Sequence, residues 1–253
     1  MNVEIIGRFA REAAALGEGT VCALFRRSFY LRFPGERYAC VGDPALGRGP
    51  LNALVPQFEM PSAGERVALS VAGATLWRPP AITVAAAPAI AALQRAASDR
   101  VPEEGLGCLI LGKHNAVAMH AQPALEALER WLVGNTLEQD AERLIGLGPG
   151  LTPSGDDYLG GMLVALRLCA RASQAQSLWR WLEPRLGGRT SAISAAHLAA
   201  AAEGEAHEAL HECLATLLGG ERPWESVLQA LDGVGHCSGW DALAGALAVL
   251  RIA

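Results

Sequence analysis

Two stretches of the chain, residues 154–161 and 238–245, share the pattern Ser-Gly-x-Asp-x-Leu-x-Gly. A Gly-x-Gly sequence precedes each copy, at residues 148–150 and 233–235. Apolar residues at helical spacing follow, so we expect each copy to open a helix. Glycine-rich loops that lead into helices favour anion sites, because backbone amides and the positive end of the helix dipole point at the ligand. The repeat therefore predicts two helix N-termini that face one pocket and hold an anionic group.

Each serine of the repeat is followed three residues later by an aspartate, which is the pattern of a capping box. In the first copy, Ser154 would accept a hydrogen bond from a first-turn amide and Asp157 would reach back. Ser238 and Asp241 would do the same in the second copy. Asp156 is not at the box position. We therefore expect Asp156 to be the freest of the three carboxylates and the best candidate for chemistry.

These aspartates would repel a bare phosphate or carboxylate, which leaves three alternatives. Asp157 and Asp241 are used as caps, or a cation such as Mg²⁺ bridges them to the ligand, or they accept N–H groups from an amide-like substrate. His236, in the second loop, is placed to act as a neutral donor or general acid beside an anion. We take Asp156, Asp157, His236 and Asp241 as candidate catalytic residues and assign no metal ligands.

Gly160 and Gly161 lie within the first turns of the first expected helix. Two glycines there cost about 1 kcal/mol each relative to alanine. Close approach of another backbone or of a ligand is the usual compensation. The alternative to a ligand site is therefore a pair of capped helices that cross tightly.

The expected elements divide the chain into a β-rich first half and a helical second half. The expected strands are residues 21–33, 38–42, 66–77 and 107–112, and two short helices are expected near 3–16 and 88–99. From about residue 122, apolar residues recur at helical spacing. We predict an α+β protein with a barrel- or sandwich-like β-rich module over residues 1–115 and an α-helical bundle over residues 116–253.

Charge and cysteine usage exclude several classes of protein. A net charge of −5 and an aromatic content of 6% argue against nucleic-acid binding. No apolar run reaches the roughly 18 residues that a membrane span needs, and the first residues lack the features of a signal peptide. The six cysteines are scattered and form no Cys-x-x-Cys pair. We expect a reduced, cytoplasmic protein that binds neither nucleic acid nor a membrane.

Residues 207–211 read His-Glu-x-x-His, which is the pattern of zinc proteases. On a helix, His207 and His211 would share one face for zinc, with Glu208 as the base. Such strings also arise from composition alone, and no Gly-x-x-His follows this one. A solvated helix face is the preferred interpretation, and a zinc metallohydrolase is kept as an alternative function.

The glycine-rich loops resemble a known family. The matching strings are Gly-x-Gly-Pro-Gly-Leu-Thr-Pro-Ser-Gly-Asp-Asp at residues 146–157, Thr-Ser-x-x-Ser at 190–194, Glu-Gly at 203–204, and Gly-His-x-Ser-Gly at 235–239. Residues 47–55, which include Asn52, resemble a Gly-x-Gly-Pro-x-Asn segment of the same family. Together these strings are similar to the AllH-type family, related to the third subunit of the bacterial oxamate carbamoyltransferase of anaerobic allantoin breakdown.

The resemblance implies a subunit of a multi-subunit transferase that moves a carbamoyl group between an oxalurate-like amide and phosphate. It implies a small anionic substrate, partner subunits and a role in purine and ureide nitrogen metabolism. A non-catalytic small-molecule-binding or assembly subunit is the alternative. Arg48 and Arg189 are the nearest arginines in sequence that could clamp an anion. The expected ligand-binding residues are Asn52, Gly148, Gly150, Thr152, Ser154, Gly155, Thr190, Ser191, Ser194, Ser238 and Gly239.

Overall fold

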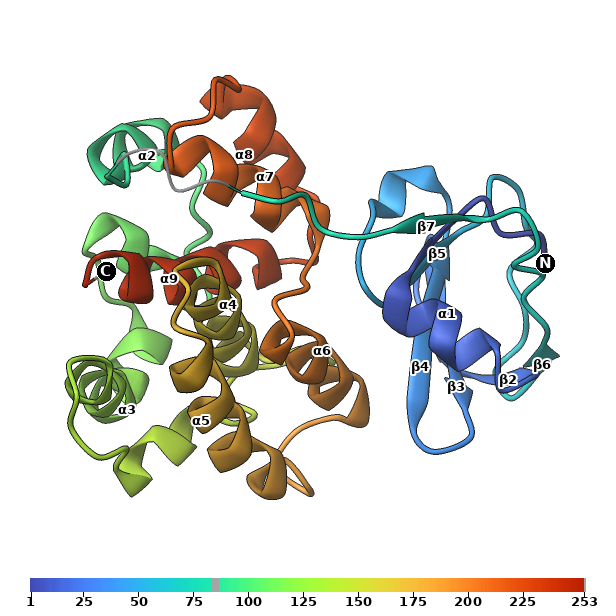
Figure 1. The fold of residues 1–253 in the computed structure, drawn as a ribbon, viewed down its shortest axis with the longest axis horizontal. Coiled ribbons are helices and arrows are strands. Elements are labelled where there is room, and N and C mark those ends of the chain that lie inside the picture. The colour runs from blue at the N-terminus through green and yellow to red at the C-terminus, as the bar shows by residue number, and fades with distance from the viewer. Residues whose placement is uncertain (83–86, 253) are drawn as a thin grey trace. The chain divides into compact units, whose positions relative to one another are not determined.

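The computed structural model describes residues 1–82 and 87–252. It divides into two compact units, Met1–Pro80 and Ala81–Ala253. The first unit contains the strands and the second contains most of the helices (Figure 1). The predicted α+β class is confirmed. The boundary between the units falls after Pro80, which is earlier in the chain than the boundary at residues 115 and 116 expected from the sequence.

The strands of the first unit form one mixed sheet in the order β6-β2-β3-β4-β5-β1-β7. Their bounds are β1 Ile5–Gly7, β2 Gly19–Leu24, β3 Ser28–Phe33, β4 Arg37–Gly42, β5 Asn52–Leu54, β6 Arg66–Val67 and β7 Thr75–Trp77. Helix α1 (Arg8–Ala14) packs the buried side chains of Ala10 and Ala13 with the strand residues Ile6, Phe29 and Leu31. The sheet and this helix therefore share one apolar core.

Strands β3 and β4 pair antiparallel, and the turn between them contains Pro34 and Gly35. Three strand predictions are wrong. Residues 21–33 hold two strands instead of one, β2 and β3, which pair antiparallel. Residues 66–77 hold two short strands instead of one, and Gly73 between them turns the chain at φ 81°. The expected strand at residues 107–112 is instead a 3₁₀ helix, η2 (Gly107–Leu111). The prediction failed because a short apolar run has no periodicity that distinguishes a strand from a helix.

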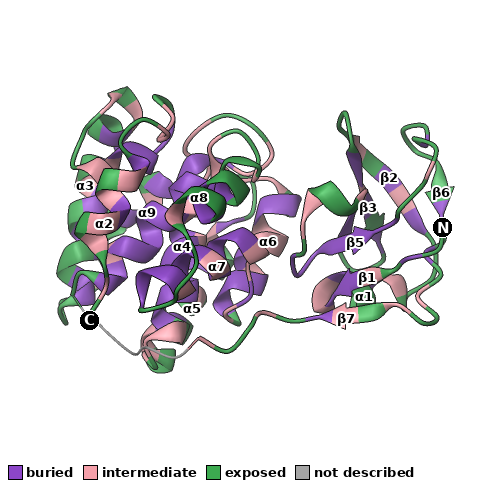
Figure 2. Ribbon diagram, turned by 90° about the horizontal axis from the view of Figure 1, so that it is seen from above, coloured by how far each residue is buried: buried purple, intermediate pink, exposed green. Residues whose placement is uncertain are grey.

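The second unit is helical, as predicted. Its α-helices are α2 Ile90–Ala97, α3 Ala116–Leu132, α4 Ser154–Leu168, α5 Ala172–Leu182, α6 Ala192–Ala202, α7 Glu208–Leu217, α8 Trp224–Asp232 and α9 Ser238–Leu250. Shorter 3₁₀ helices are η1 Pro44–Leu46 in the first unit and η2, η3 Gln139–Leu144 and η4 Glu183–Arg185 in the second. Figure 2 shows that α4 and α9 are largely buried. These two helices form the centre of the core, and the glycine-rich loops lead into them.

Among the described residues, no helix has both the length and the apolar character needed to cross a membrane. The six cysteines are free thiols. The short helices expected near residues 3–16 and 88–99 are confirmed as α1 and α2.

Candidate functional site

Helices α4 and α9 lie side by side (Figure 1), and one glycine from each brings the two backbones into contact. A Cβ atom added to Gly161 would lie 1.8 Å from the carbonyl oxygen of Ala242, and one added to Gly245 would lie 1.9 Å from that of Tyr158. Gly161 and Gly245 are equivalent positions of the repeat, as are Tyr158 and Ala242. The two copies therefore pack against each other with approximate twofold symmetry. The predicted backbone approach is confirmed at Gly161.

The polar residues at the two helix starts also pair between the copies. The hydroxyl oxygens of Thr152 and Ser238 lie 3.0 Å apart. The Ser238 hydroxyl hydrogen bonds Asp157, and the Ser154 hydroxyl hydrogen bonds Asp241. Each serine of the repeat thus hydrogen bonds the aspartate of the other copy.

The predicted capping boxes are wrong. The N-cap residues are Pro153 for α4 and Cys237 for α9, and neither makes a side-chain capping hydrogen bond. Ser154 and Ser238 are the first residues inside their helices, one position too late to cap them. Their hydroxyls are therefore available to the neighbouring helix.

The pairing shows that the two helices run in the same direction. Ser154 neighbours Asp241, and Tyr158 neighbours Gly245 further along, so the pairing advances along both helices together. Two positive helix ends consequently lie side by side, which favours negative charge at that point. The first turns carry Asp156, Asp157 and Asp241.

Asp241 fastens the start of α9 to the loop before η2. Its Oδ1 accepts hydrogen bonds from the backbone amides of Leu106 at 2.6 Å and Gly107 at 2.9 Å. The side chain is buried. Burial raises the pKa of Asp241 to about 6, although the Ser154 hydroxyl and the two amides act in the opposite direction. Asp241 therefore has a structural role that its position in the repeat does not show.

Asp157 has one carboxyl oxygen that makes no hydrogen bond to the described residues, which we call the uncommitted oxygen. Its Oδ2 is buried and has no hydrogen-bond partner among the described residues, although the residue as a whole is only half-buried. Burial raises the pKa of this carboxyl well above its ordinary value, and the charges of Asp241 and Asp156 raise it further. Hydrogen bonds from Ser238 and Thr152 lower it. Burial and the neighbouring carboxyl groups therefore shift this carboxyl toward its neutral form.

Asp156 is the most engaged of the three carboxylates, in contrast to the expectation that it is the freest. It is 2% exposed, and its Oδ1 accepts a hydrogen bond from the Gly146 amide at 2.8 Å. Its Oδ2 accepts hydrogen bonds from the hydroxyls of Thr190 and Ser194, the latter at 2.6 Å. Asp156 thereby joins the first loop, the start of α4 and the start of α6.

A cluster of three side chains, Glu104, His236 and Cys237, lies beside the start of α9. The Nε2 atom of His236 is 3.0 Å from Oε2 of Glu104, and both side chains are exposed. The donor atoms of Glu104, His236 and Cys237 all lie within 4.8 Å of one another. Burial raises the pKa of the Cys237 thiol to about 11, and the charges of Asp241, Glu104 and Asp157 contribute. This group therefore lies within electrostatic reach of the paired helix starts.

The comparison with known proteins concerns the same region. Residues 144–250 match the family model described as oxamate carbamoyltransferase subunit AllH. This region is AllH-type. The match begins at the end of η3 and ends with α9, so it includes both copies of the repeat and both helix starts. No match was found among curated proteins or among solved structures.

The glycine-rich loops of the AllH-type region already use part of their hydrogen-bonding capacity. The amide of Gly155 donates to the carbonyl of Leu147 at 2.9 Å, and that of Gly239 donates to the carbonyl of Val234 at 3.2 Å. These two amides are therefore not open to an anion. The hydroxyls of Thr152 and Ser238 and the Oδ2 atom of Asp157 are among the groups that a ligand could contact at the helix starts.

Other predicted ligand residues support the first loop. Ser191 is the N-cap of α6, accepting a hydrogen bond from the Ser194 amide at 2.9 Å and donating one to the Leu151 carbonyl at 2.5 Å. Gly148 and Gly150 have φ values of 111° and 93°, which favour glycine. These residues shape the loop and hold it against α6.

Asn52 belongs to the first unit. It lies in β5, and its side-chain amide donates to the Gly47 carbonyl at 2.9 Å. This hydrogen bond fixes the turn that the sequence analysis matched to the family segment at residues 47–55. The proximity of Asn52 to the helix starts stays a prediction.

The His-Glu-x-x-His string does not form the zinc-protease arrangement. Helix α7 begins at Glu208, and His207 is its N-cap, whose Nδ1 accepts a hydrogen bond from the Ala209 amide at 3.2 Å. Nε2 of His211 accepts one from the Ala206 amide at 3.1 Å. The two histidines therefore stabilise the start of α7, and each uses a ring-nitrogen lone pair to do so.

His211 gives the fold a pH dependence. Burial lowers its pKa from 6.5 to about 4, and the charge of His207 lowers it further. The folded state therefore binds fewer protons than the unfolded state between these values, so stability falls as pH decreases from about 6.5 towards 4. We expect His211→Gln, which keeps an acceptor for the Ala206 amide, to remove about 3 kcal/mol of this acid destabilisation. Urea unfolding at about pH 7.5 and about pH 4.5 measures the difference in the free energy of unfolding between these conditions.

The matched control is His120→Gln, because His120 is an exposed histidine on α3. It should leave the pH dependence of stability as in the unmodified chain. An unchanged pH dependence in His211→Gln would show that protonation of other groups causes the acid destabilisation.

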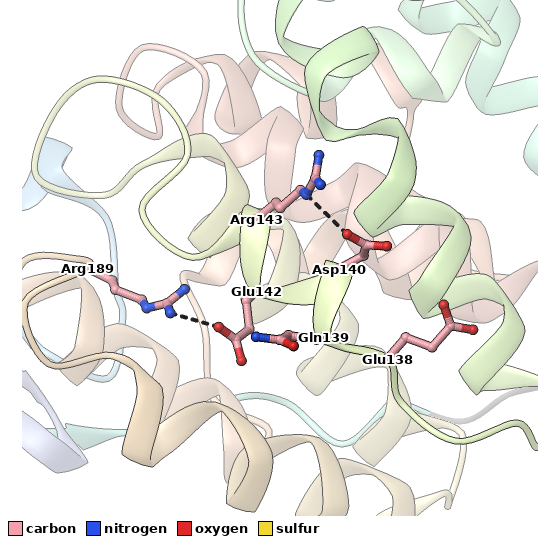
Figure 3. Close-up of a pocket in the computed structure, with 6 residues that line it drawn as sticks. All are labelled: Glu138, Gln139, Asp140, Glu142, Arg143 and Arg189. Carbon is pink, nitrogen blue, oxygen red and sulfur yellow. Dashed lines mark ion pairs between the residues drawn. The ribbon is translucent and has the colours of Figure 1, made fainter.

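A cavity of about 560 Å³ lies beside η3, and Asp157 is not among the residues that line it (Figure 3). Its charged groups are paired with one another: Arg189 with Glu142 at 2.8 Å, and Arg143 with Asp140 at 3.2 Å. Arg189, a candidate anion clamp from its place in the sequence, therefore points at the carboxylate of Glu142. This cavity offers no uncompensated positive charge to an anionic ligand.

Two residues beside the start of α9, Glu104 and Cys237, were not expected from the sequence. Cys237 was set aside because it has no Cys-x-x-Cys partner, although it directly follows the candidate His236. Glu104 lies in a loop far away in the sequence and carries no motif. The hydrogen bonds from the amides of Leu106 and Gly107 to Asp241 and the contact of Glu104 with His236 hold that loop at the start of α9.

Proposed function

We propose that this chain is a carbamoyltransferase subunit that binds a small anionic amide at the paired starts of α4 and α9. The observation that carries the proposal is the buried, uncommitted Oδ2 of Asp157 between two parallel helix starts. The AllH family description supports the reaction class and a place in ureide nitrogen metabolism with partner subunits. We also propose that the protein acts in the cytoplasm.

The ligand class follows from the groups that remain open. Oxamate, oxalurate and carbamoyl phosphate each combine an anionic end with an amide end. The two positive helix ends attract the anion, and a neutral Asp157 avoids the repulsion that a charged carboxylate would cause. The hydroxyls of Thr152 and Ser238 accept N–H groups from the amide end.

The transfer needs no protein nucleophile. A phosphate oxygen forms a bond to the carbamoyl carbon of an oxalurate-like substrate, and the bond from that carbon to the oxamate nitrogen breaks. The leaving nitrogen must gain one proton. Asp157, whose neutral form is favoured by burial, is the proposed donor of that proton. Positioning and charge stabilisation supply the remainder.

Ligand binding tests the proposal directly. We expect carbamoyl phosphate, oxamate or oxalurate to raise the melting temperature of the purified chain. At a hundredfold excess over Kd the stabilisation is about 2.7 kcal/mol. Asp157→Asn and Ser238→Ala should abolish most of the shift, because each removes a group at the paired starts. Differential scanning fluorimetry, followed by calorimetry, measures the effect.

Ser226→Ala is the matched control for the serine variant. Ser226 lies on α8 and its hydroxyl donates to the Pro223 carbonyl, so the ligand-induced shift should be retained. If no ligand of this class stabilises the folded chain, the proposed ligand site is wrong. If Ser226→Ala loses the shift as completely as Ser238→Ala, the ligand binds elsewhere.

A non-catalytic binding or assembly subunit is the second candidate. It is favoured by the number of motif groups with structural duties, namely Asp156, Asp241 and the amides of Gly155 and Gly239. Turnover by the complex reconstituted with Asp157→Asn separates the two candidates. A catalytic subunit loses turnover but still assembles, whereas an assembly subunit retains both.

A further inference from the structure

We propose that Glu104, His236 and Cys237 bind a divalent metal ion of the zinc class. One carboxylate oxygen, one imidazole nitrogen and one sulfur lie within 4.8 Å of one another, and no other such group of three occurs among the residues that the structure describes. Carboxylate, imidazole and thiolate are the three side-chain ligand types of zinc sites. The site is separate from the uncommitted oxygen of Asp157 and goes beyond the proposed function.

The separations suit a small tetrahedral ion. Zinc binds oxygen and nitrogen at about 2.0–2.2 Å and sulfur at about 2.3 Å, which places its ligands roughly 3.3–3.6 Å apart. The Nε2 atom of His236 and Oε2 of Glu104 are 3.0 Å apart. Their side chains are 80% and 73% exposed, so small rotations can admit an ion between them and the sulfur of Cys237.

The backbone of the site is held from two directions. Asp241 accepts the amides of Leu106 and Gly107, which fixes one end of the Glu104 loop to α9. Asn115, the N-cap of α3, donates from its side-chain amide to the carbonyls on either side of Glu104, both at 2.8 Å. The main chain is therefore organised before an ion binds, which lowers the cost of ordering the ligands.

The negative charge around Cys237 favours binding of a cation, and the ligand types favour zinc over Mg²⁺. The negative charges of Asp241 and Glu104 raise the pKa of the Cys237 thiol. A bound dication would offset their charge, and the thiol would release its proton to solvent as the metal binds. Thiolate and imidazole ligands favour zinc over Mg²⁺, which prefers oxygen ligands in octahedral geometry. Three protein ligands leave one tetrahedral position for water or substrate.

Cobalt(II) is the spectroscopic probe for this site. We expect the full chain, first treated with a chelator, to bind one equivalent of Co²⁺ and show a thiolate-to-cobalt charge-transfer absorption that Zn²⁺ abolishes and excess Mg²⁺ does not. Cys237→Ser should lose the absorption, and His236→Ala should weaken Co²⁺ binding at least about tenfold. Cys22→Ser, which removes an exposed thiol in the first unit, should keep both.

Two results would overturn the proposal. One is the absence of the absorption in chain that circular dichroism shows to be folded, which would leave His236 and Glu104 as an exposed ion pair. The other is an absorption that survives Cys237→Ser. Because the readout is metal binding alone, failure here is distinguishable from failure of the proposed ligand site, whose readout is the shift caused by amide ligands.

Discussion

Gly161→Ala should destabilise the helical unit more than any other conservative substitution at the paired helix starts. The added Cβ would lie 1.8 Å from the Ala242 carbonyl oxygen, and backbone on both sides leaves no flexible side chain to move aside. α4 and α9 would have to separate, which would open the apolar contacts that both helices make in the core. We expect a loss of at least about 3 kcal/mol in the free energy of unfolding, measured by urea denaturation.

The adjacent glycine supplies a matched control. A Cβ added to Gly160 would lie 3.7 Å from the Cβ of Ala201, which is ordinary van der Waals contact. Alanine is favoured over glycine in a helix by about 1 kcal/mol, so Gly160→Ala should be neutral or stabilising. Equal destabilisation by both variants would show that local backbone conformation, and not the α4–α9 contact, sets the requirement for glycine.

Asp156→Ala should have the second largest effect, and the effect should be on stability. The substitution leaves the Gly146 amide and the hydroxyls of Thr190 and Ser194 without their shared acceptor. Unsatisfied buried donors cost about 1–3 kcal/mol each, which gives an expected loss of about 3–5 kcal/mol after partial relaxation. Asp156→Asn should cost less, because its amide retains one acceptor oxygen and can donate to the hydroxyls.

Asp140→Ala is the control for loss of an aspartate. Asp140 lies in η3 and pairs with Arg143 on the surface, where an ion pair contributes about 0–1 kcal/mol. Urea denaturation of the three variants at one pH gives the comparison. An Asp156→Ala chain with unchanged stability but no ligand binding would assign Asp156 to the ligand after all.

The sequence predicts the α+β division and the two helix starts well, because both depend on local patterns. Periodicity separates the strand-rich and helix-rich halves, and the repeat marks Ser154 and Ser238 as equivalent residues at the starts of helices. The backbone approach at Gly161 could also be predicted, since a glycine in a helix requires a compensating contact.

The roles of the aspartates could not be predicted, because they depend on which segments the fold brings together. Asp157 is at the correct spacing to cap its own helix, yet it hydrogen bonds a serine of the other copy. Asp156 has no local partner in the sequence, and its three donors come from a loop and from α6. Spacing identified these residues, but only the tertiary structure shows which of them have an oxygen to spare.

The contact between α4 and α9 has a consequence for how the chain acquires its structure. During synthesis from the N-terminus, α4 leaves the ribosome before α5, α6, α7, α8 and α9 exist. The face of α4 that packs against α9 therefore has no permanent partner until four intervening helices have been made, and contacts between segments so distant in sequence form slowly. Until α9 arrives, the nascent helical unit exposes surface that invites aggregation or chaperone binding.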